Sequence, residues 1–233
     1  MFAAETQGLV AVRYIPNDSR SAQVIVTNRT NRPVTLRLPL AFAGVPVLAQ
    51  MGGGMGGMGG GGGGAGFGAG GIGGGPQTTG GGMGGQGMNG MGGGGAGGGG
   101  GAFSIPPQKT RVLRIATVCL EHGKPEPSSR YPYKLAAIDS FSSDPKLTLV
   151  LESLGRGELP QKVAQAAAWH LSNGMSWERL AAEKIDHAGG VPDEAYFTPA
   201  ELMAAQRVVA IATQQAAARQ PAEASAASSA INQ

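Results

Sequence analysis

The side chains that most directly suggest chemistry are a single cysteine and three histidines. Cys119 with His122, His170 or His187 could form a thiolate–imidazole pair, with Asp139 orienting the ring. A catalytic cysteine is usually activated by a helix N-terminus or a nearby cation. The residues around this cysteine have the pattern of a β-strand, which supplies neither. We therefore expect a buried structural cysteine and no enzymatic activity.

Metal binding is the second chemistry to consider. The cysteine and the histidines are separated by 3, 48 and 17 residues, which matches no zinc-binding pattern. Thioethers can bind Cu(I), and six methionines lie in a glycine-rich tract, namely Met51, Met55, Met58, Met83, Met88 and Met91. These methionines come without histidines, and sparse side chains that make transient contacts are the simpler interpretation. We expect no metal and no cofactor.

Nucleic-acid binding is suggested by one helical stretch. LPQKVAQAAAWHLSNGMSWERLAAEKI (159–185) resembles a helix-turn-helix with a short glycine-containing turn. A recognition helix must sit among phosphates, whereas the second helix here mixes acidic and basic residues, namely Glu178, Glu183, Asp186, Arg179 and Lys184. A plain αα-hairpin is favoured, and we expect no nucleic-acid partner.

Charge and hydropathy exclude further classes. The net charge of +3 arises locally, because residues 1–50 carry five arginines against two acids and residues 102–233 carry thirteen charges of each sign. Nucleic-acid binding usually needs basic residues gathered on one face. No run of eighteen apolar residues occurs, so we expect no transmembrane segment.

Short β-like segments lie on both sides of the glycine tract. They are rich in β-branched residues and bounded by turn signals, and they read LVAVRYI, AQVIVTN, VTLRLPL, VPVLAQ, TRVLRIATVCL and YPYKLAAI. Alternation along the strand puts Cys119 on the face of Leu113 and Ile115, which favours burial. The pattern predicts an α+β protein whose β part, 9–50 and 102–140, is an Ig-like antiparallel β-sandwich.

The glycine tract itself, residues 51–101, holds 34 of the 42 glycines of the 233-residue chain. It has almost no side chains to bury against the entropy cost of ordering, so we expect a disordered low-complexity insertion. Because the β pattern resumes after it, an insertion between two strands of one sandwich is favoured over a linker between two domains. Deleting residues 52–101 should then leave the melting transition intact.

Helical periodicity begins after the last strand and covers residues 143–219. Asp144 and Pro145 read as an N-cap and a first helical residue, and Gly174 ends the second helix. Thr198 to Glu201 form a capping box that opens a long alanine-rich helix to about Arg219. The small polar residues 220–233 are expected to be a disordered tail.

The segment Ala164-Gln165-Ala-Ala-Ala168-Trp169 resembles the glutamine-containing helical motif of bacterial surface thioester domains. In that family a cysteine thiol and a glutamine amide form an internal thioester that host amines attack. The resemblance implies that Cys119 and Gln165 are the bonding pair. Their separation of 46 residues is shorter than that family uses, and no aromatic residue precedes the cysteine.

The order of VTNRTNRPVTLRLPL, a glycine-rich block, RIATVCLEHGKPEP and LGRGELPQKVAQAAAWHLSNGMSWERLA resembles a set of uncharacterised exported glycine-rich proteins of planctomycete bacteria. The resemblance implies export but no activity. MFAAETQGLV lacks the charged and apolar regions of a signal peptide, so an export signal is expected upstream of it. We expect a non-catalytic exported or cell-envelope structural or interaction protein with an unknown protein or envelope partner; a thioester-bearing surface adhesin is the alternative.

Overall fold

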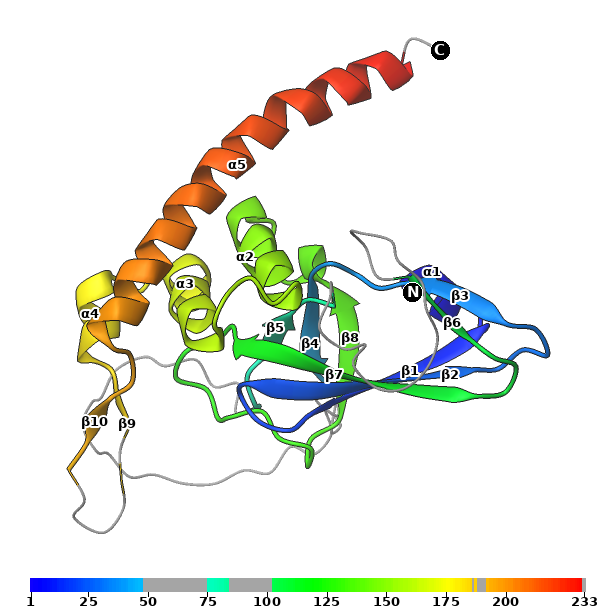
Figure 1. Cartoon of the computed structure of the whole chain (residues 1–233), viewed down its shortest axis with the longest axis horizontal. Coiled ribbons are helices and arrows are strands. Elements are labelled where there is room, and N and C mark those ends of the chain that lie inside the picture. Colours follow the sequence, from blue (N-terminus) through cyan, green and yellow to red (C-terminus); the bar gives the residue numbers. More distant parts are fainter. Residues whose placement is uncertain (48–74, 84–101, 186, 188–191, 232–233) are drawn as a thin grey trace, which may run out of the picture.

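The β-structure closes into a barrel. The structure, a computed structural model, describes residues 1–47, 75–83, 102–185, 187 and 192–231. Six antiparallel strands follow one another around the barrel in the order β1-β2-β7-β5-β4-β8 (Figure 1). Their bounds are β1 Val10–Pro16, β2 Ser21–Asn28, β7 Thr110–Cys119, β5 Thr79–Gly81, β4 Phe42–Pro46 and β8 Tyr133–Ala137.

Alternating side chains of these strands fill the barrel interior. In β2 every second residue is buried, and Val24 and Val26 have no exposed surface. Val24 lies opposite Tyr14 of β1 and Leu113 of β7, and all three belong to one buried cluster. The tight β1–β2 connection is fixed by Asp18, whose carboxylate accepts hydrogen bonds from two backbone N–H groups beyond it.

A second, two-stranded sheet extends one end of the barrel. It pairs β3, Val34–Arg37, with β6, Ala102–Ile105, and the short helix α1, Phe2–Thr6, lies beside it. The Asn28 side chain joins this sheet to β2, because its amide donates to the carbonyls of Ile105 and Arg32.

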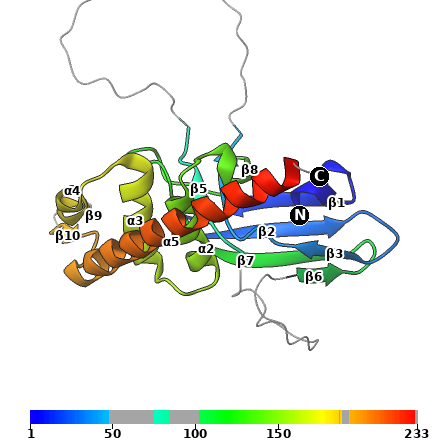
Figure 2. The same cartoon turned by 90° about the horizontal axis from the view of Figure 1, so that it is seen from above.

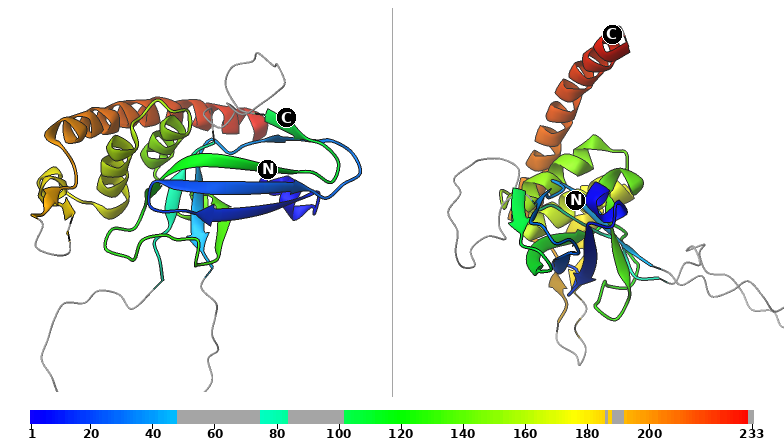
Figure 3. Two further views of the ribbon diagram at one scale, coloured as in Figure 1. Left: turned by 60° about the horizontal axis from the view of Figure 1, so that its bottom comes forward. Right: turned by 90° about the vertical axis from the view of Figure 1, so that its right-hand side faces the viewer.

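Helices cover the outer face of β4, β5 and β7. After the 3-10 turn η1, Ile138–Ser140, come α2 Pro145–Gly155, α3 Gln161–Asn173, α4 Trp177–Ala182, the small hairpin of β9 Lys184–Ile185 and β10 Glu194–Ala195, and α5 Pro199–Ile231. Their apolar residues form one buried cluster with Val118 and Leu120 of the barrel. α5 crosses α3 and α2 (Figure 2), and its far end projects away from them (Figure 3).

The helix starts agree with the sequence analysis. Asp144 accepts a hydrogen bond from the Lys146 N–H with Pro145 at the first helical position, and Thr198 and Glu201 bond each other's backbone N–H groups in a reciprocal capping box. The end of α5 differs from the prediction, because residues 220–231 are helical. Alanine, the strongest helix former, is the commonest residue of that segment.

The predicted Ig-like sandwich is wrong: the β-structure is a closed barrel within an α+β protein. The physical reason is a strand inside the glycine tract, since β5 pairs with β7 on one side and with β4 on the other. Residues 75–83 are buried throughout, so these nine residues depart from the expected disordered insertion 51–101. The rest of that insertion lies outside the described residues. Deleting residues 52–101 would remove a barrel strand, and we now expect it to lower the melting temperature.

Candidate functional site

Cys119 is the last residue of β7 and is 1% exposed. Burial, together with the negative charges of Glu126 and Asp18, raises the pKa of its thiol to about 12. The thiol is therefore protonated at neutral pH, while a cysteine nucleophile must be a thiolate. This agrees with the buried position that strand alternation predicted.

The backbone of Cys119 is bound by the Gln165 side chain from α3. The Cys119 N–H donates to Gln165 Oε1 over 2.8 Å, and Gln165 Nε2 donates to the Cys119 carbonyl over 2.9 Å. β2 would be the neighbour at this edge of β7, but its pairing ends where the Thr117 N–H donates to the Arg20 carbonyl. The carboxamide of Gln165, which is fully buried, thus replaces a peptide group of the missing strand.

Other side chains of α3 continue this pairing. Each makes one hydrogen bond to the backbone at the end of β7 or just beyond it: Gln161 Nε2 donates to the Thr117 carbonyl (3.1 Å), Ser172 Oγ donates to the Leu120 carbonyl (2.9 Å) and Asn173 Oδ1 accepts from the His122 N–H (3.0 Å). Gln161 and Gln165 are four residues apart and so share one face of the helix. We call this row of contacts the β7–α3 seam.

The structure therefore brings the predicted thioester pair, Cys119 and Gln165, together. The contact is between the Gln165 amide and the Cys119 backbone, and both polar atoms of the amide are used in it. Thioester formation would need the thiolate to attack the amide carbon with loss of ammonia, which would break the Nε2 hydrogen bond. The thioester stays a prediction, and the geometry gives Gln165 a structural role without it.

The three histidines occupy three separate places. His122 Nε2 lies 3.0 Å from Glu183 and its ring packs edge-on against Trp169. His170 stacks on the Trp177 ring, and His187 lies 3.6 Å from Glu194. Among the hydrogen bonds of the described residues, none joins a histidine to the Cys119 thiol.

Asp139, the proposed orienting carboxylate, lies in η1, the 3-10 turn that follows β8. Within the part of the chain that the structure describes, no three His, Cys, Asp or Glu residues form a group able to hold a metal ion. Met83 is 4% exposed and belongs to the barrel core. The other five methionines of the Cu(I) hypothesis lie outside the described residues.

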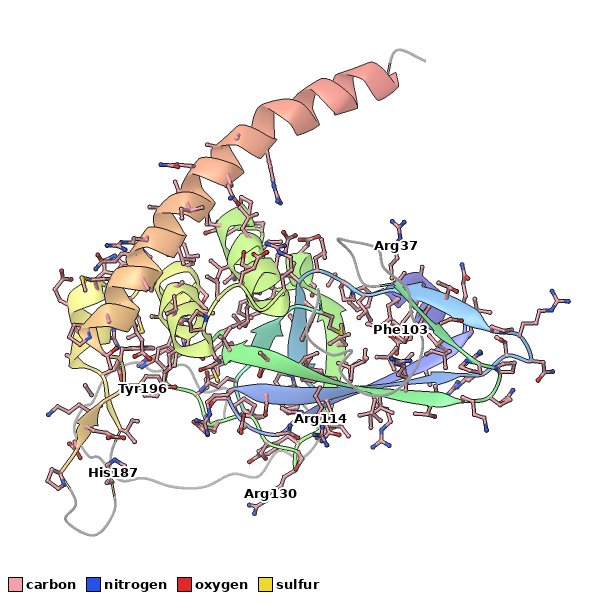
Figure 4. The ribbon with its side chains drawn as sticks, viewed as in Figure 1. Arg37, Phe103, Arg114, Arg130, His187 and Tyr196 are labelled. Atoms are coloured by element: carbon pink, nitrogen blue, oxygen red, sulfur yellow. The ribbon has the colours of Figure 1, made fainter. Side chains whose placement is uncertain are left out.

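An aromatic cluster joins α3 to the β9–β10 hairpin. Lys162 Nζ donates to the Tyr196 carbonyl over 2.7 Å and lies 3.6 Å from the centre of the Tyr196 ring. Trp169 packs against Tyr196 and Phe197. Figure 4 shows Tyr196 on the helical side of the molecule, far from Phe103 and Arg37 of the small sheet. The cluster fastens the hairpin to the helices.

Residues 75–83 are held by a group of contacts that the sequence did not predict. We call the surroundings of this segment, which include Tyr14, Phe42 and Tyr133, the seat of β5. The hydroxyls of Tyr14 and Thr79 share a buried hydrogen bond of 2.5 Å, and the Tyr133 hydroxyl donates to the Gln77 carbonyl over 2.7 Å. Gln77 Nε2 donates to the Lys124 carbonyl. Residues 76–79, PQTT, are the longest run without glycine in the tract. This run was the one feature of the tract that could have indicated an ordered segment.

Close packing of glycines completes the seat. An added Cβ at Gly81 would lie 2.7 Å from Phe42 Cζ and 2.9 Å from the Ala116 carbonyl oxygen. At Gly82 it would lie against the Leu40 carbonyl oxygen and 2.5 Å from that of Leu151. Real Cβ atoms do not approach other atoms so closely. The seat therefore accepts glycine alone at these positions.

A small groove lies between α2 and α5. It encloses about 220 Å³ and is lined mainly by apolar side chains, including Leu149, Leu159, Val208 and Ile211. Sites for small molecules usually enclose about 300–1,000 Å³ and gather a few convergent polar groups. Arg156 and Glu158 at this groove bond each other.

No family model, curated protein or solved structure matches this chain. Among the described residues, no helix is long and apolar enough to cross a membrane. Both groups of buried polar contacts, the β7–α3 seam and the β5 seat, fasten backbone segments to one another.

Proposed function

We propose that this protein is a non-catalytic structural or interaction protein of the cell envelope or extracellular space, in which the barrel holds the glycine-rich tract. One observation carries the proposal: residues 75–83, from the middle of the tract, are buried, and β5 within them is a strand of the barrel wall. The barrel thus holds the tract near its centre, at β5, and the tract is flanked by the barrel strand β4 and by β6 of the small sheet.

The chemistry of the described residues supports a holding role. The thiol of Cys119 is protonated at neutral pH because burial raises its pKa. The side chains of Gln165, Tyr14 and Thr79 are occupied in contacts between elements. Buried polar groups that are fully paired give rigidity and a unique arrangement.

Export is supported by the resemblance to exported glycine-rich planctomycete proteins. The test is the fractionation of cells that produce the protein naturally, followed by protease treatment of spheroplasts and detection with an antibody. We expect the protein in the envelope or the medium and open to protease, while a cytoplasmic marker stays protected. A protein that fractionates with that marker and resists protease until the cells are lysed would contradict the proposed location.

The second candidate is a surface adhesin with an internal thioester, favoured by the contact between Gln165 and Cys119. The intact mass of the protein decides it, because the bond forms with loss of one ammonia. A mass lower by one ammonia that returns to the unmodified value after methylamine and alkali treatment would support the adhesin. An unmodified mass, with Cys119 alkylated once per chain after denaturation, would reject it. A Cys119→Ser variant is the matched control.

A further inference from the structure

We propose that β5 can exchange between two copies of this chain, so that residues 75–83 of each copy complete the barrel of the other. The inference deepens the proposed function by naming a second copy of the chain as the partner. It rests on the seat of β5 and on how β5 is connected to the rest of the chain. Both are particular to this strand.

The seat selects its occupant by sequence. It needs glycine at the positions of Gly81 and Gly82, where a Cβ would collide with backbone oxygens, and the Thr79 hydroxyl adds a hydrogen bond to Tyr14. Thr-Gly-Gly-Gly occurs once in the chain, at 79–82. The segment that fits the seat in one copy is therefore the same segment of another copy.

The connections of β5 are long on both sides. Between described residues, 27 residues (48–74) precede the segment and 18 residues (84–101) follow it. Extended chains of these lengths span at most about 90 Å and about 60 Å, which is enough to reach a neighbouring barrel. By contrast, β1 and β2 are joined by the four residues 17–20, which hold that pair within one copy.

Exchange leaves every contact of β5 unchanged. Its pairing with β4 and β7, the Tyr14–Thr79 bond and the Tyr133–Gln77 bond all form equally with a strand from either copy. The ratio of exchanged to unexchanged protein then depends on two concentrations, that of the second copy and the effective concentration of the strand tethered in the same chain. The effective concentration is in the millimolar range for short linkers and falls as the linker lengthens.

Departure of β5 also creates the binding surface. A closed barrel has no strand edge, whereas removing β5 exposes the edges of β4 and β7. β5 itself is three residues long, and its release also breaks the backbone hydrogen bonds made by Gln77, Thr78 and Met83, which form again when a β5 re-enters. The open edges are then refilled by a β5 from the same copy or from another one.

A designed disulfide tests the exchange. Thr79 lies opposite Cys119, the only cysteine, and the neighbouring pair is hydrogen-bonded, because the Leu120 N–H donates to the Thr78 carbonyl. Residues 79 and 119 thus form a non-hydrogen-bonded pair with Cα atoms about 4.5 Å apart, which lies within the range of a disulfide. In a T79C variant, a 79–119 disulfide within one chain shows that the barrel contains its own β5, and a disulfide between two chains shows that β5 has exchanged.

The T79C protein is refolded from an equal mixture of ¹⁵N-labelled and unlabelled chains, with reduced and oxidised glutathione present. Refolding is done at about 1 µM and at about 1 mM, below and near the effective concentration of a tethered strand. Cross-linked peptides are then analysed by mass spectrometry. We expect disulfides between labelled and unlabelled chains, with a share that rises at least several-fold at the higher concentration, and a dimer by non-reducing electrophoresis.

Two other results would overturn the exchange and separate it from the proposed function. Disulfides only within single chains at both concentrations would reject exchange and leave the tract anchored as proposed. No disulfide between residues 79 and 119 in either form would reject the exchange and the anchoring together. The matched control is T78C, whose side chain lies on the other face of the strand and should form no such disulfide. Light scattering on the unmodified protein, refolded at both concentrations, checks that the dimer does not depend on the variant.

Discussion

Gln165 shows how one residue can resemble a reactive group and serve a structural purpose. It has no exposed surface, and its amide pairs with the N–H and the carbonyl of Cys119 at the edge where β2 ends. A buried backbone group without a partner is costly. The amide removes that cost at two groups and ties α3 to the barrel.

Replacing Gln165 should therefore destabilise the fold strongly. Gln165→Leu leaves two buried backbone groups of Cys119 without partners, and we expect a loss of about 2–4 kcal/mol in the free energy of unfolding. Gln161→Leu is the matched control, because Gln161 is only half-buried and bonds a single carbonyl. We expect it to cost about 1 kcal/mol. Urea unfolding measures both, and equal losses would show that the Gln165 pairing has no special weight.

The Cys119 thiol makes stability depend on alkaline pH. Its pKa is about 12 in the folded protein against an ordinary value of 9.0, so between these values the unfolded chain loses a proton that the folded chain keeps. The contribution of the thiol to the free energy of unfolding is complete below pH 9 and is lost as the pH rises from about 9 to about 12.

A Cys119→Ala variant isolates the effect of the thiol. Tyr14, Tyr133 and Tyr196 also have raised pKa values, first from burial and in smaller part from Cys119. The burial part of these shifts is common to both proteins. The difference in unfolding free energy between the native chain and the variant should shrink by up to about 1.4 kcal/mol per pH unit above pH 9. A difference that stays constant from pH 8 to pH 11 would contradict the buried, protonated thiol.

At the scale of elements, β5 shows how a glycine-rich segment can act as a barrel strand. Gly80 and Gly81 of β5, and Gly82 directly after it, pack so closely that the surrounding strands and α2 occupy the space where side chains would lie. α2 also approaches through a glycine, because Gly155 lies against the backbone of Gly82. Small residues on both sides thus let backbone pack on backbone.

Two alanine substitutions separate these close approaches. Gly82→Ala places a Cβ against the backbone oxygens of Leu40 and Leu151, which cannot move aside, and we expect a cost of about 3 kcal/mol or more. Gly80→Ala meets only the ends of the flexible Leu120 and Leu151 side chains, at 2.8 and 3.0 Å, so it should cost less. Thermal unfolding compares them. If the Gly82→Ala variant has the melting temperature of the native chain, Gly82 does not pack against these backbone oxygens.

The elements differ in how far the sequence could predict them. Helix starts were predictable because capping residues such as Asp144 and Thr198 act locally, and the burial of Cys119 followed from strand alternation. β5 was not predictable, because a segment of mostly glycine has no hydrophobic periodicity and low strand propensity. The hydrogen bonds of Gln165 to the Cys119 backbone were not predictable either, because they depend on where β2 ends in space.

At the scale of the whole molecule, β5 unites the two parts of the fold. It is the wall between β4 and β7, and its outer face lies under α2 and the helical core. The barrel, the helices and the glycine-rich tract therefore meet at one short segment. Its loss should open the barrel and loosen the contact between barrel and helices together.

The most direct measurement is made on a variant in which residues 76–79, PQTT, are replaced by four glycines. Chain length is unchanged, but the side chains of Gln77 and Thr79 that fasten β5 are removed. We predict a clearly lower melting temperature and rapid hydrogen exchange at the Leu120 amide, which donates to the Thr78 carbonyl in the native chain. A variant that keeps the native melting temperature and a protected Leu120 amide would contradict the anchoring of the tract by β5.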